Sequence, residues 1–352
     1  MKRMTLLMGL ALACAVATAQ PIIDGRNIPS EFGTALASQT NHTGFGDRVS
    51  GVHWGSELNQ LFVRCQGGVL YIGVTGNLEG NGNAFHFYID TGRNPNHTFT
   101  LTTGCINCSV QGMSGVVFDH KPDWALGINR YDDGQGNDNI YADLHDLVNN
   151  VSTYVGYSRT DSGSGTLIGG TNPFGIQAAL DNSNTAGITS DPNNVGNPAT
   201  ATTGMEVAIP LSALNYSGGR IRILVVLTGG ADLGDPCRGT YMSNQTLPAL
   251  NIGNTSQQFP NVAWVRCPDP PFDSFPFSFQ VSAPGVQYVE IDCPVGPPGD
   301  VDGNGCVDDA DLLAVLFDFG CSSNCGAEDV NSDGVVDDAD LLIVLFNFGQ
   351  GC

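Results

Sequence analysis

The sequence has few basic side chains. Its 352 residues include 13 lysines and arginines against 35 aspartates and glutamates, which gives a formal net charge of −22 at pH 7. A chain this acidic is repelled by phosphate backbones and by anionic lipid surfaces. The shortage of positive charge therefore argues against nucleic acid and anionic membranes as partners.

Recognisable catalytic motifs are also absent. The sequence has no Gly-x-Ser-x-Gly elbow, no His-Glu-x-x-His pair and no glycine-rich loop that leads from a strand into a helix with a lysine. The histidines are scattered, and we expect them to be surface or hydrogen-bonded structural residues: His42, His53, His86, His97, His120 and His145. The sequence therefore favours a non-catalytic protein, and we assign no catalytic residue.

Carboxylates keep one enzyme class open, because a glycosidase needs only two of them at a separation set by the fold. Four stand in or beside predicted strands and are the candidates for a glycoside hydrolase: Asp90, Asp123, Asp143 and Glu206. Asp90 and Glu206 also fit a structural role, in which a carboxylate at a strand end binds loop backbone. The sequence does not decide between these two interpretations.

Three tryptophans are candidates for stacking on sugar rings, and each has a place in the core as its alternative. They are Trp54, Trp124 and Trp264. Trp124 has polar neighbours, so we expect it to be the exposed one. The oxygen-rich loop from Asp132 to Asn139 is either a further calcium site or a plain hairpin loop.

Long apolar stretches are missing after the first residues. Lys2 and Arg3 precede an apolar run from Leu6 to Val16, and the small residues Ala17-Thr18-Ala19 follow it. This pattern is typical of a secretory signal peptide, here residues 1–19. We expect a secreted protein, extracellular or at the cell surface. No later stretch is long and apolar enough for a membrane helix, so no integral membrane segment is predicted.

Secretion changes how the cysteines are interpreted. Once Cys14 leaves with the signal peptide, ten remain: Cys65, Cys105, Cys108, Cys237, Cys267, Cys293, Cys306, Cys321, Cys325 and Cys352. An even number in an oxidising compartment favours disulfides. Zinc at Cys105-x-x-Cys108 is the alternative, although the sequence offers no second pair of ligands nearby.

The end of the chain contains a repeat. Residues 300–320 read DVDGNGCVDDADLLAVLFDFG and residues 329–349 read DVNSDGVVDDADLLIVLFNFG, so 15 of 21 positions are identical. Residues 300–352 hold 12 acidic side chains and no lysine or arginine. The interleaved leucine, valine and phenylalanine distinguish this segment from a disordered acidic tail.

Each repeat begins with the twelve-residue pattern of a calcium loop. Loop positions 1, 3, 5, 7, 9 and 12 are Asp300, Asp302, Asn304, the carbonyl of Cys306, Asp308 and Asp311 in the first repeat. They are Asp329, Asn331, Asp333, the carbonyl of Val335, Asp337 and Asp340 in the second. Four carboxylates in one short loop repel one another unless a cation neutralises them. The sequence therefore predicts two bound Ca²⁺ ions.

An apolar stretch follows each loop. Its pattern predicts helices that begin near Ala310 and Ala339 and end at Gly320 and Gly349. The first helix has a wide apolar face made of Leu312, Leu313, Leu316 and Phe317. We expect the two helices to pack on each other, related by a pseudo-twofold axis.

These two loop–helix units resemble a type I dockerin over residues 300–352. The resemblance implies calcium ligands at loop positions 1, 3, 5, 7 and 12, with position 9 acting through water, and a cohesin-like protein partner. Loop positions 10 and 11 help to dock the partner in that family; here they are Asp309-Ala310 and Asp338-Ala339 instead of the frequent hydroxyl pairs. The cysteines of the module depart from the family, and one attractive pairing joins Cys293 with Cys352.

The region before the module has many short β-like runs separated by turn residues. They cover residues 61–65, 69–76, 84–90, 140–144, 153–158, 205–210, 221–229, 277–281 and 286–291. The predicted fold is mainly β: an antiparallel, jelly-roll-like β-sandwich body over residues 20–292, with long polar loops at 159–204. A Pro/Gly linker over 293–299 leads to the small α-helical module at 300–352.

Several phrases of the body resemble the family 9 carbohydrate-binding and DOMON-like sandwiches. They are IIDGRNIPSEFG, LYIGVTGNL, HFYIDT and GMEVAIPLSAL. The resemblance implies a sandwich fold and a body that binds a glycan or a matrix component. The leading hypothesis is a secreted, non-catalytic protein with a calcium-binding attachment or stabilising module. The alternatives are a polysaccharide-active enzyme that carries a dockerin and a calcium-locked structural or envelope protein.

Overall fold

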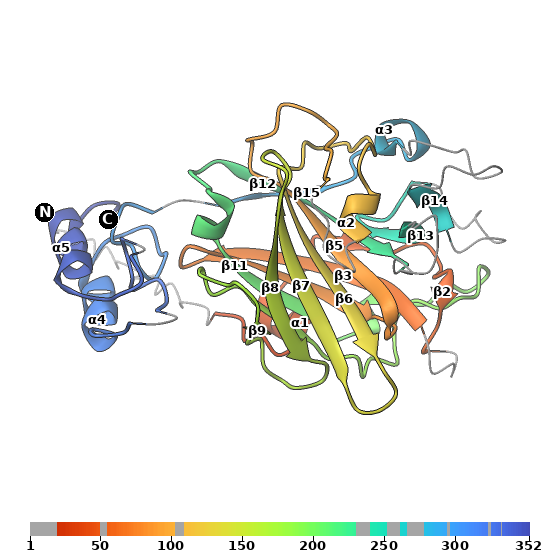
Figure 1. Ribbon diagram of the computed structural model, residues 1–352, viewed down its shortest axis with the longest axis horizontal. Helices are drawn as coiled ribbons and strands as arrows, with labels where there is room; N and C mark the ends of the chain where they lie inside the picture. The colour runs from red at the N-terminus through yellow and green to blue at the C-terminus, as the bar shows by residue number, and fades with distance from the viewer. Residues whose placement is uncertain are drawn as a thin grey trace, which may run out of the picture.

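The computed structural model describes residues 20–49, 55–102, 109–229, 240–251, 261–265, 278–293, 296–322, 325–331 and 333–352. The signal peptide predicted for residues 1–19 lies outside them. The protein is mainly β, and all strand pairs in this part of the chain are antiparallel. The helical module lies at one end of a large β body (Figure 1). The mainly β fold expected from the sequence is confirmed.

The smaller sheet has the order β1-β3-β4-β11-β10, with β2 paired to β3. Its strands are β1 Ala37–Ser38, β2 Phe45–Gly46, β3 Gly55–Gln66, β4 Val69–Asn77, β10 Gln177–Leu180 and β11 Gly204–Pro210. Gly67 and Gly68 join β3 to β4 with φ of 57° and 67°. Two consecutive left-handed residues make the tight hairpin turn that matches the strand twist.

The larger sheet has the order β14-β13-β12-β5-β6-β7-β8-β9, with β15 paired to β12. Its strands are β5 Asn81–Asp90, β6 Trp124–Asp132, β7 Asp138–Asp146, β8 Val151–Arg159, β9 Ile168–Gly169, β12 Arg220–Thr228, β13 Thr240–Leu247, β14 Asn261–Val265 and β15 Val289–Asp292. Strands β6, β7 and β8 lie side by side at the front of the body in Figure 1.

The main core lies between the two sheets. Leu61 and Ile72 of the smaller sheet and Phe85, Leu126 and Ile223 of the larger one belong to one buried cluster. A β-sandwich is defined by this arrangement, in which the inner faces of two sheets share one core. Along β7, Ile140, Ala142 and Leu144 join this cluster, so the alternate residues Tyr141 and Asp143 point to the opposite face.

A second core covers part of the outer face of the larger sheet. Tyr88, Leu224 and Val226 pack there with Phe118 and Phe279. The covering segments include α2 Ser109–Gly112 and α3 Phe279–Ser282. Short helices α1 Ile28–Phe32, η1 Pro198–Thr200 and η2 Leu211–Leu214 complete the body.

The run at 277–281 was predicted as a strand, and this prediction is wrong because Ser278 caps α3 through a bond from the Val281 amide.

The module contains α4 Asp309–Phe317 and α5 Asp338–Asn347. The disulfide between Cys65 at the end of β3 and Cys293 after β15 anchors the start of the linker to the body. No helix in the described ranges has the length and apolar character needed to cross a membrane.

Candidate metal centre

Each helix of the module begins with a capping box built from loop residues. The side chain of Asp308 accepts the Ala310 amide at 2.8 Å, and Asp311 Oδ2 accepts the Asp308 amide at 2.8 Å. Asp337 and Asp340 make the same two bonds in the second repeat, at 2.8 and 2.9 Å. Reciprocal bonds of this kind satisfy amides that the first helical turn leaves open. The acidic residues at positions 9 and 12 therefore fix where each loop ends and each helix starts.

The first loop gathers three carboxylates around one point. One carboxylate oxygen from each of Asp300, Asp302 and Asp311 lies within 4.8 Å of the other two. Asp311 is fully buried, and its Oδ1 accepts the amides of Val301 and Asp302 at 2.6 and 3.0 Å. Oxygens on opposite sides of a calcium ion lie about 5 Å apart. The spacing in the first loop is compatible with that ion.

Asp300 holds the loop turn and also keeps one oxygen unused. Its Oδ2 accepts the Gly305 amide at 2.9 Å, and Gly305 has the positive φ of 90° expected at loop position 6. Asp300 Oδ1 is buried and has no hydrogen-bond partner among the described residues. Burial, and after it the charges of Asp311 and Asp302, raise the pKa of Asp300. Asp300 thus has an oxygen that lacks a counter-charge.

The second loop repeats this backbone with a different set of carboxylates. Asp329 Oδ2 accepts the Gly334 amide at 2.8 Å, and Asp340 Oδ1 accepts the Asn331 amide at 3.0 Å. Position 3 is Asn331, so the trio of carboxylates seen in the first loop has no counterpart in the described part of the second. Asp333 at position 5 supplies the additional carboxylate and accepts the Val335 amide at 3.0 Å. Both loops therefore retain an oxygen donor at each predicted position.

The remaining predicted ligands of the first loop are also placed by local bonds. Asn304 Oδ1 accepts the Cys306 amide at 2.8 Å, and the main-chain amide of Asn304 donates to Asp302 Oδ1 at 3.0 Å. Cys306 uses its sulfur in a disulfide with Cys352. The main-chain carbonyl of Cys306 is therefore the group at loop position 7 that could bind an ion.

Each loop pairs with the segment that follows the helix of the other repeat. The Val307 amide donates to Gln350 O at 2.9 Å, and the Gly349 amide donates to Val307 O at 2.7 Å. The Val336 amide donates to Cys321 O at 3.0 Å, and the Gly320 amide donates to Val336 O at 2.9 Å. Equivalent residues make equivalent bonds in both directions, which is the pseudo-twofold relation expected from the repeat.

The helices use a narrower buried face than expected. The module core consists of Val301, Val307, Val315, Val336 and Val344. Of the predicted apolar face of the first helix, Leu312 packs against this core, whereas Leu313, Leu316 and Phe317 are exposed. The two helices pack on each other as expected, but they do so through small valines, so three of the four side chains of the predicted apolar face lie outside.

Disulfides further cross-link the module. Cys306 is bonded to Cys352, which ties the first loop to the end of the chain, and Cys321 is bonded to Cys325 between the repeats. The predicted pairing of Cys293 with Cys352 is wrong, since Cys293 bonds to Cys65 of the body. Asp318 lies near Cys321 and Cys325, but cysteines in a disulfide offer no thiolate to a metal. Cys105, Cys108, Cys237 and Cys267 lie outside the described residues.

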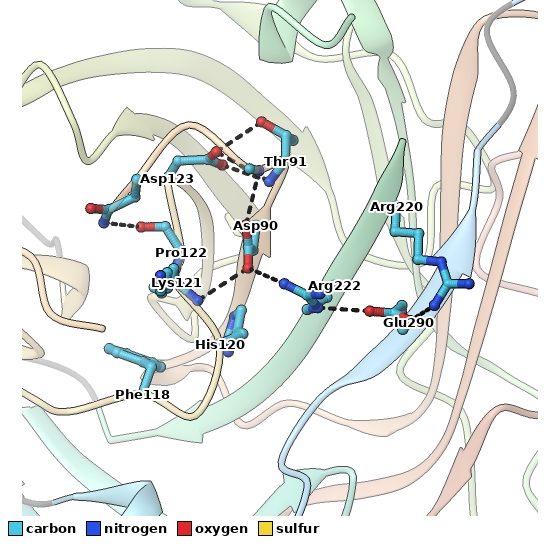
Figure 2. A network of polar contacts seen from close by, with 12 residues as sticks. Asp90, Thr91, Phe118, His120, Lys121, Pro122, Asp123, Arg220, Arg222 and Glu290 are labelled. Carbon is cyan, nitrogen blue, oxygen red and sulfur yellow. Dashed lines mark hydrogen bonds and ion pairs between the residues drawn. The ribbon is translucent and has the colours of Figure 1, made fainter. Parts of the chain in front are cut away.

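Two candidate catalytic carboxylates hold loops against the larger sheet (Figure 2). Asp90 Oδ1 accepts the Gly92 amide at 2.9 Å, and its Oδ2 contacts the Lys121 amide and the Arg222 guanidinium at 3.1 and 3.3 Å. Asp123 Oδ2 accepts the Thr91 hydroxyl at 2.8 Å. These bonds match the structural interpretation of a strand-end carboxylate.

Glu206 has a similar role on the smaller sheet. Its Oε2 accepts the amides of Asp24 and Gly25 at 2.9 and 2.7 Å. Burial raises the pKa of Glu206 to about 8. Glu206 Oε1 and Asp143 Oδ1 are both buried without a partner. Asp143 differs from the other three candidates because no hydrogen bond to either of its carboxylate oxygens is found in the described part of the chain. Burial raises the pKa of Asp143 to about 7.

Trp124 is not an exposed sugar platform. It is 6% exposed and belongs to the main core. Its ring nitrogen donates to Leu214 O at 2.8 Å, and the Arg93 guanidinium lies 4.9 Å from the ring centre. The expectation of exposure is wrong because Trp124 lies on the face of β6 that holds Leu126 and Ile128 in the main core, whereas its polar neighbours precede the strand. Trp54 and the side chain of Trp264 lie outside the described residues.

The loop from Asp132 to Asn139 is the hairpin between β6 and β7. Asp133 Oδ1 accepts the amides of Gln135 and Asn137 at 2.7 and 3.1 Å. The Arg130 guanidinium binds both oxygens of Asp138 at 2.8 and 2.6 Å. These bonds account for the acidic residues as turn and ion-pair groups, which is the hairpin alternative.

Sequence reasoning missed a group of tyrosines around Asp143. Tyr141 of β7 and Tyr154 and Tyr157 of β8 lie on the outer face of the larger sheet. The signal was available in the period-two pattern of these strands, where tyrosine and aspartate alternate with core residues.

No known family model matches the chain, and comparisons with curated proteins and with solved structures found no significant match.

Proposed function

We propose that the chain is a secreted, non-catalytic binding protein whose C-terminal module, residues 300–352, is held together by calcium and attaches the body to a protein partner. The observation that supports the calcium module best is the gathering of Asp300, Asp302 and Asp311 within 4.8 Å. The module has no lysine or arginine to offset its acidic residues. A cation from solution is the remaining counter-charge.

The donor set fits calcium in particular. Calcium prefers six to eight oxygen ligands, whereas structural zinc prefers thiolate and imidazole. The residues that would hold the two ions are Asp300, Asp302, Asn304, Cys306, Asp308 and Asp311, and Asp329, Asn331, Asp333, Val335, Asp337 and Asp340. Asp308 and Asp337 already cap their helices, so their contribution would pass through water. The ion supplies charge neutralisation, and the loop amides pre-orient the carboxylates that receive it.

The exposed helix faces are the proposed docking surface. Phe317 and Phe346 are 86% and 79% exposed. With them the repeats present Leu313, Leu316 and Phe319, and Leu342, Leu345 and Phe348. This number of exposed large apolar side chains on about 50 residues is typical of an interaction surface. Because the module has 12 acidic side chains and no lysine or arginine, the proposed occupant is a cohesin-like protein with an apolar surface bordered by basic side chains.

Calorimetric titration of calcium into the full mature chain, stripped with a chelator, tests the module. Two ions are expected for the natural protein and one for Asp300→Asn. Asp309→Asn is the matched control, because Asp309 is an exposed neighbour outside the carboxylate cluster. No binding by the natural chain, or unchanged binding by Asp300→Asn, would contradict the proposal.

Binding to a panel of purified cohesin modules, measured by biolayer interferometry, tests the docking surface. Calcium-dependent binding that Phe317→Ser and Phe346→Ser together weaken at least tenfold is expected. Light scattering of the same samples reports self-association through this surface. A dimer of the chain, or no binding to any basic-rimmed cohesin, would contradict the chosen occupant.

The body is the part proposed to bind a glycan or matrix component. A polysaccharide-active enzyme is the second candidate, and Asp143 is the observation that favours keeping it, since its carboxylate is not engaged by loop backbone. Hydrolysis of polysaccharides by the natural chain at enzymic rates, lost in Asp143→Asn, would replace the binding proposal with a glycoside hydrolase. Calcium-induced self-assembly into regular arrays would instead support the structural or envelope protein.

A further inference from the structure

The outer face of β7 and β8 carries three tyrosines around one carboxylate. Asp143 and Tyr154 are direct partners across the two strands, as are Tyr141 and Tyr157. The register shifts between Ala142 and Asp143, which brings Tyr154 onto the same face as the other two tyrosines. Residues directly opposite in an antiparallel pair have neighbouring side chains. The four side chains therefore form one cluster, here called the tyrosine platform.

The platform lies where the covering of the larger sheet ends. Val110 of α2 reaches Gly127 of β6, since a Cβ atom at that glycine would lie 2.9 Å from the valine side chain. Gly127 is the strand partner of Asp143. Beyond α2, Tyr154 is 38% exposed and Tyr141 and Tyr157 are partly exposed. The platform thus has a wall on one side and solvent on the other.

Asp143 lacks the partners that the other buried carboxylates have. It is only 7% exposed, and within the described residues its Oδ1 has no donor. Its raised pKa has burial as its cause, with no lysine or arginine charge offsetting it. A buried carboxylate without a donor is costly. The other oxygen, Oδ2, is not among the buried atoms without a partner. A ligand that donates hydrogen bonds to Oδ2 would lower the cost of burying this carboxylate.

The ring geometry indicates what kind of ligand fits. The rings of Tyr141 and Tyr157 have centres 6.0 Å apart and planes inclined by 33°. Cages for ammonium groups enclose the cation between steep aromatic walls, whereas these two rings are closer to parallel. A sugar ring has an apolar face that covers aromatic rings and hydroxyl groups that donate to a carboxylate. An acidic sugar is disfavoured, because Asp143 and the net charge of −22 repel it.

We propose that Tyr141, Tyr154, Tyr157 and Asp143 form a binding site for a neutral polysaccharide, with sugar rings against the tyrosines and sugar hydroxyls donating to Asp143. This inference rests on the proposed role of the body as a binding domain and adds its site and ligand class. Beyond β8 the sheet continues with the two residues of β9, and the Thr171 amide donates to Tyr154 O at 2.8 Å. The exposed side chain of Tyr154 is therefore the part of the platform that a ligand reaches from solvent.

Affinity electrophoresis of the full mature chain in calcium, through gels that contain xyloglucan, mixed-linkage β-glucan, galactomannan or arabinoxylan, tests the site. We expect the protein to migrate more slowly in a gel that contains at least one of these polysaccharides than in a gel without polysaccharide. Tyr154→Ala and Asp143→Asn should each weaken that binding at least tenfold. Phe174→Ala and Asp132→Asn are the matched controls, since both residues are exposed and lie outside the platform.

The variants remain informative if one of them folds poorly. Tyr154 is partly exposed and Asn has the shape of Asp, so unchanged circular dichroism is expected for both variants. Retardation by none of the four polysaccharides, or equal retardation of all variants, would overturn the site. Saturable binding of tetramethylammonium that Asp143→Asn abolishes, without polysaccharide binding, would also overturn it. The calcium titration does not depend on the platform, so the two proposals fail separately.

Discussion

The body and the module stabilise their buried carboxylates in different ways. In the body, Asp90, Asp123 and Glu206 lie beside an extensive apolar core and receive hydrogen bonds from loop amides. In the module, the core has only five buried valines among the described residues, with partly buried side chains such as Leu312 and Leu341 against them. The carboxylates of the first loop converge on one another. A unit of about 50 residues rarely buries enough apolar surface to fold alone and commonly needs metals or disulfides. The comparison predicts that the body depends on burial and the module on ions and cross-links.

Calcium removal should have the largest effect, because it should destabilise the module and leave the stability of the body unchanged. A chelator should abolish the cooperative unfolding transition of the module and leave that of the body in place. At a calcium concentration 1,000 times Kd, each ion contributes about 4 kcal/mol to the free energy of unfolding. Differential scanning calorimetry of the full mature chain, with magnesium in place of calcium as a control, measures both transitions. A module transition that is unchanged by chelation would show that valine packing and disulfides suffice.

The module disulfides should have the next largest effect. The Cys306–Cys352 bond closes a sequence separation of 46 residues and the Cys321–Cys325 bond closes one of 4. Chain entropy predicts that opening the first costs about 4 kcal/mol and opening the second about 2 kcal/mol. Paired Cys→Ser variants, unfolded with denaturant in saturating calcium, give both values. Equal losses would indicate that native contacts, and not loop closure, set the effect.

The pH dependence of the body should show the cost of its buried carboxylates. Burial raises the pKa of Glu206 from an ordinary value of 4.5 to about 8. A carboxyl whose folded pKa is raised binds its proton more tightly in the folded state, so it favours folding below pH 4.5. This stability is lost as pH rises to about 8. Glu206→Gln should stabilise the body at pH 9 relative to the natural chain by about 2 kcal/mol and change little at pH 5.

The measurement is thermal unfolding of the body transition at both pH values. Asp132→Asn serves as the control, since this carboxylate is exposed at the end of β6. If the stability of Glu206→Gln followed that of the natural chain at every pH, the pKa of Glu206 would be the same in the folded and the unfolded chain.

Sequence patterns predicted those elements whose residues alternate or run apolar over their length. β4, β5, β11 and β12 were predicted with small boundary errors, and both calcium loops have the turn glycine and capping residues in place. β6, WALGINRYD, was missed because Gly127 and its polar residues interrupt the alternation. The strand predicted at 277–281 overlaps the helix α3 Phe279–Ser282, because short apolar runs do not distinguish strand from helix.

Among the candidate sites, those that are local in sequence were likewise predicted, and those that depend on strand register were not. The proposed calcium loops are local in sequence, so their candidate ligands could be listed from the sequence alone. The tyrosine platform needs the β7–β8 register and its shift at Asp143, and no local pattern encodes that shift. The pairing of Cys65 with Cys293 depends on β3 and β15 meeting near β12, which is likewise a property of the assembled sheets.

The smallest expected effect comes from a substitution at the contact between the module and the body. Gly303 of the first loop meets Gly67 in the β3–β4 turn, and a Cβ atom at Gly303 would lie 2.1 Å from the Gly67 nitrogen. The second repeat has Ser332 at the corresponding position. Gly303→Ala should therefore separate the module from the body while both loops still bind calcium, with a backbone strain of about 1 kcal/mol from the positive φ of 68°.

Small-angle scattering measures this separation as a larger radius of gyration, and calcium titration checks the loops. Gly320→Ala is the matched control, because Gly320 also has a positive φ, 92°, but nothing lies within 4 Å of its Cβ position. The control carries the same kind of backbone strain without the contact. If only Gly303→Ala expands the chain, the close approach of Gly303 to Gly67 is what holds the first loop against the body. If both variants expand it, backbone strain in the module is the cause, and the body and module are joined by the linker and the Cys65–Cys293 anchor alone.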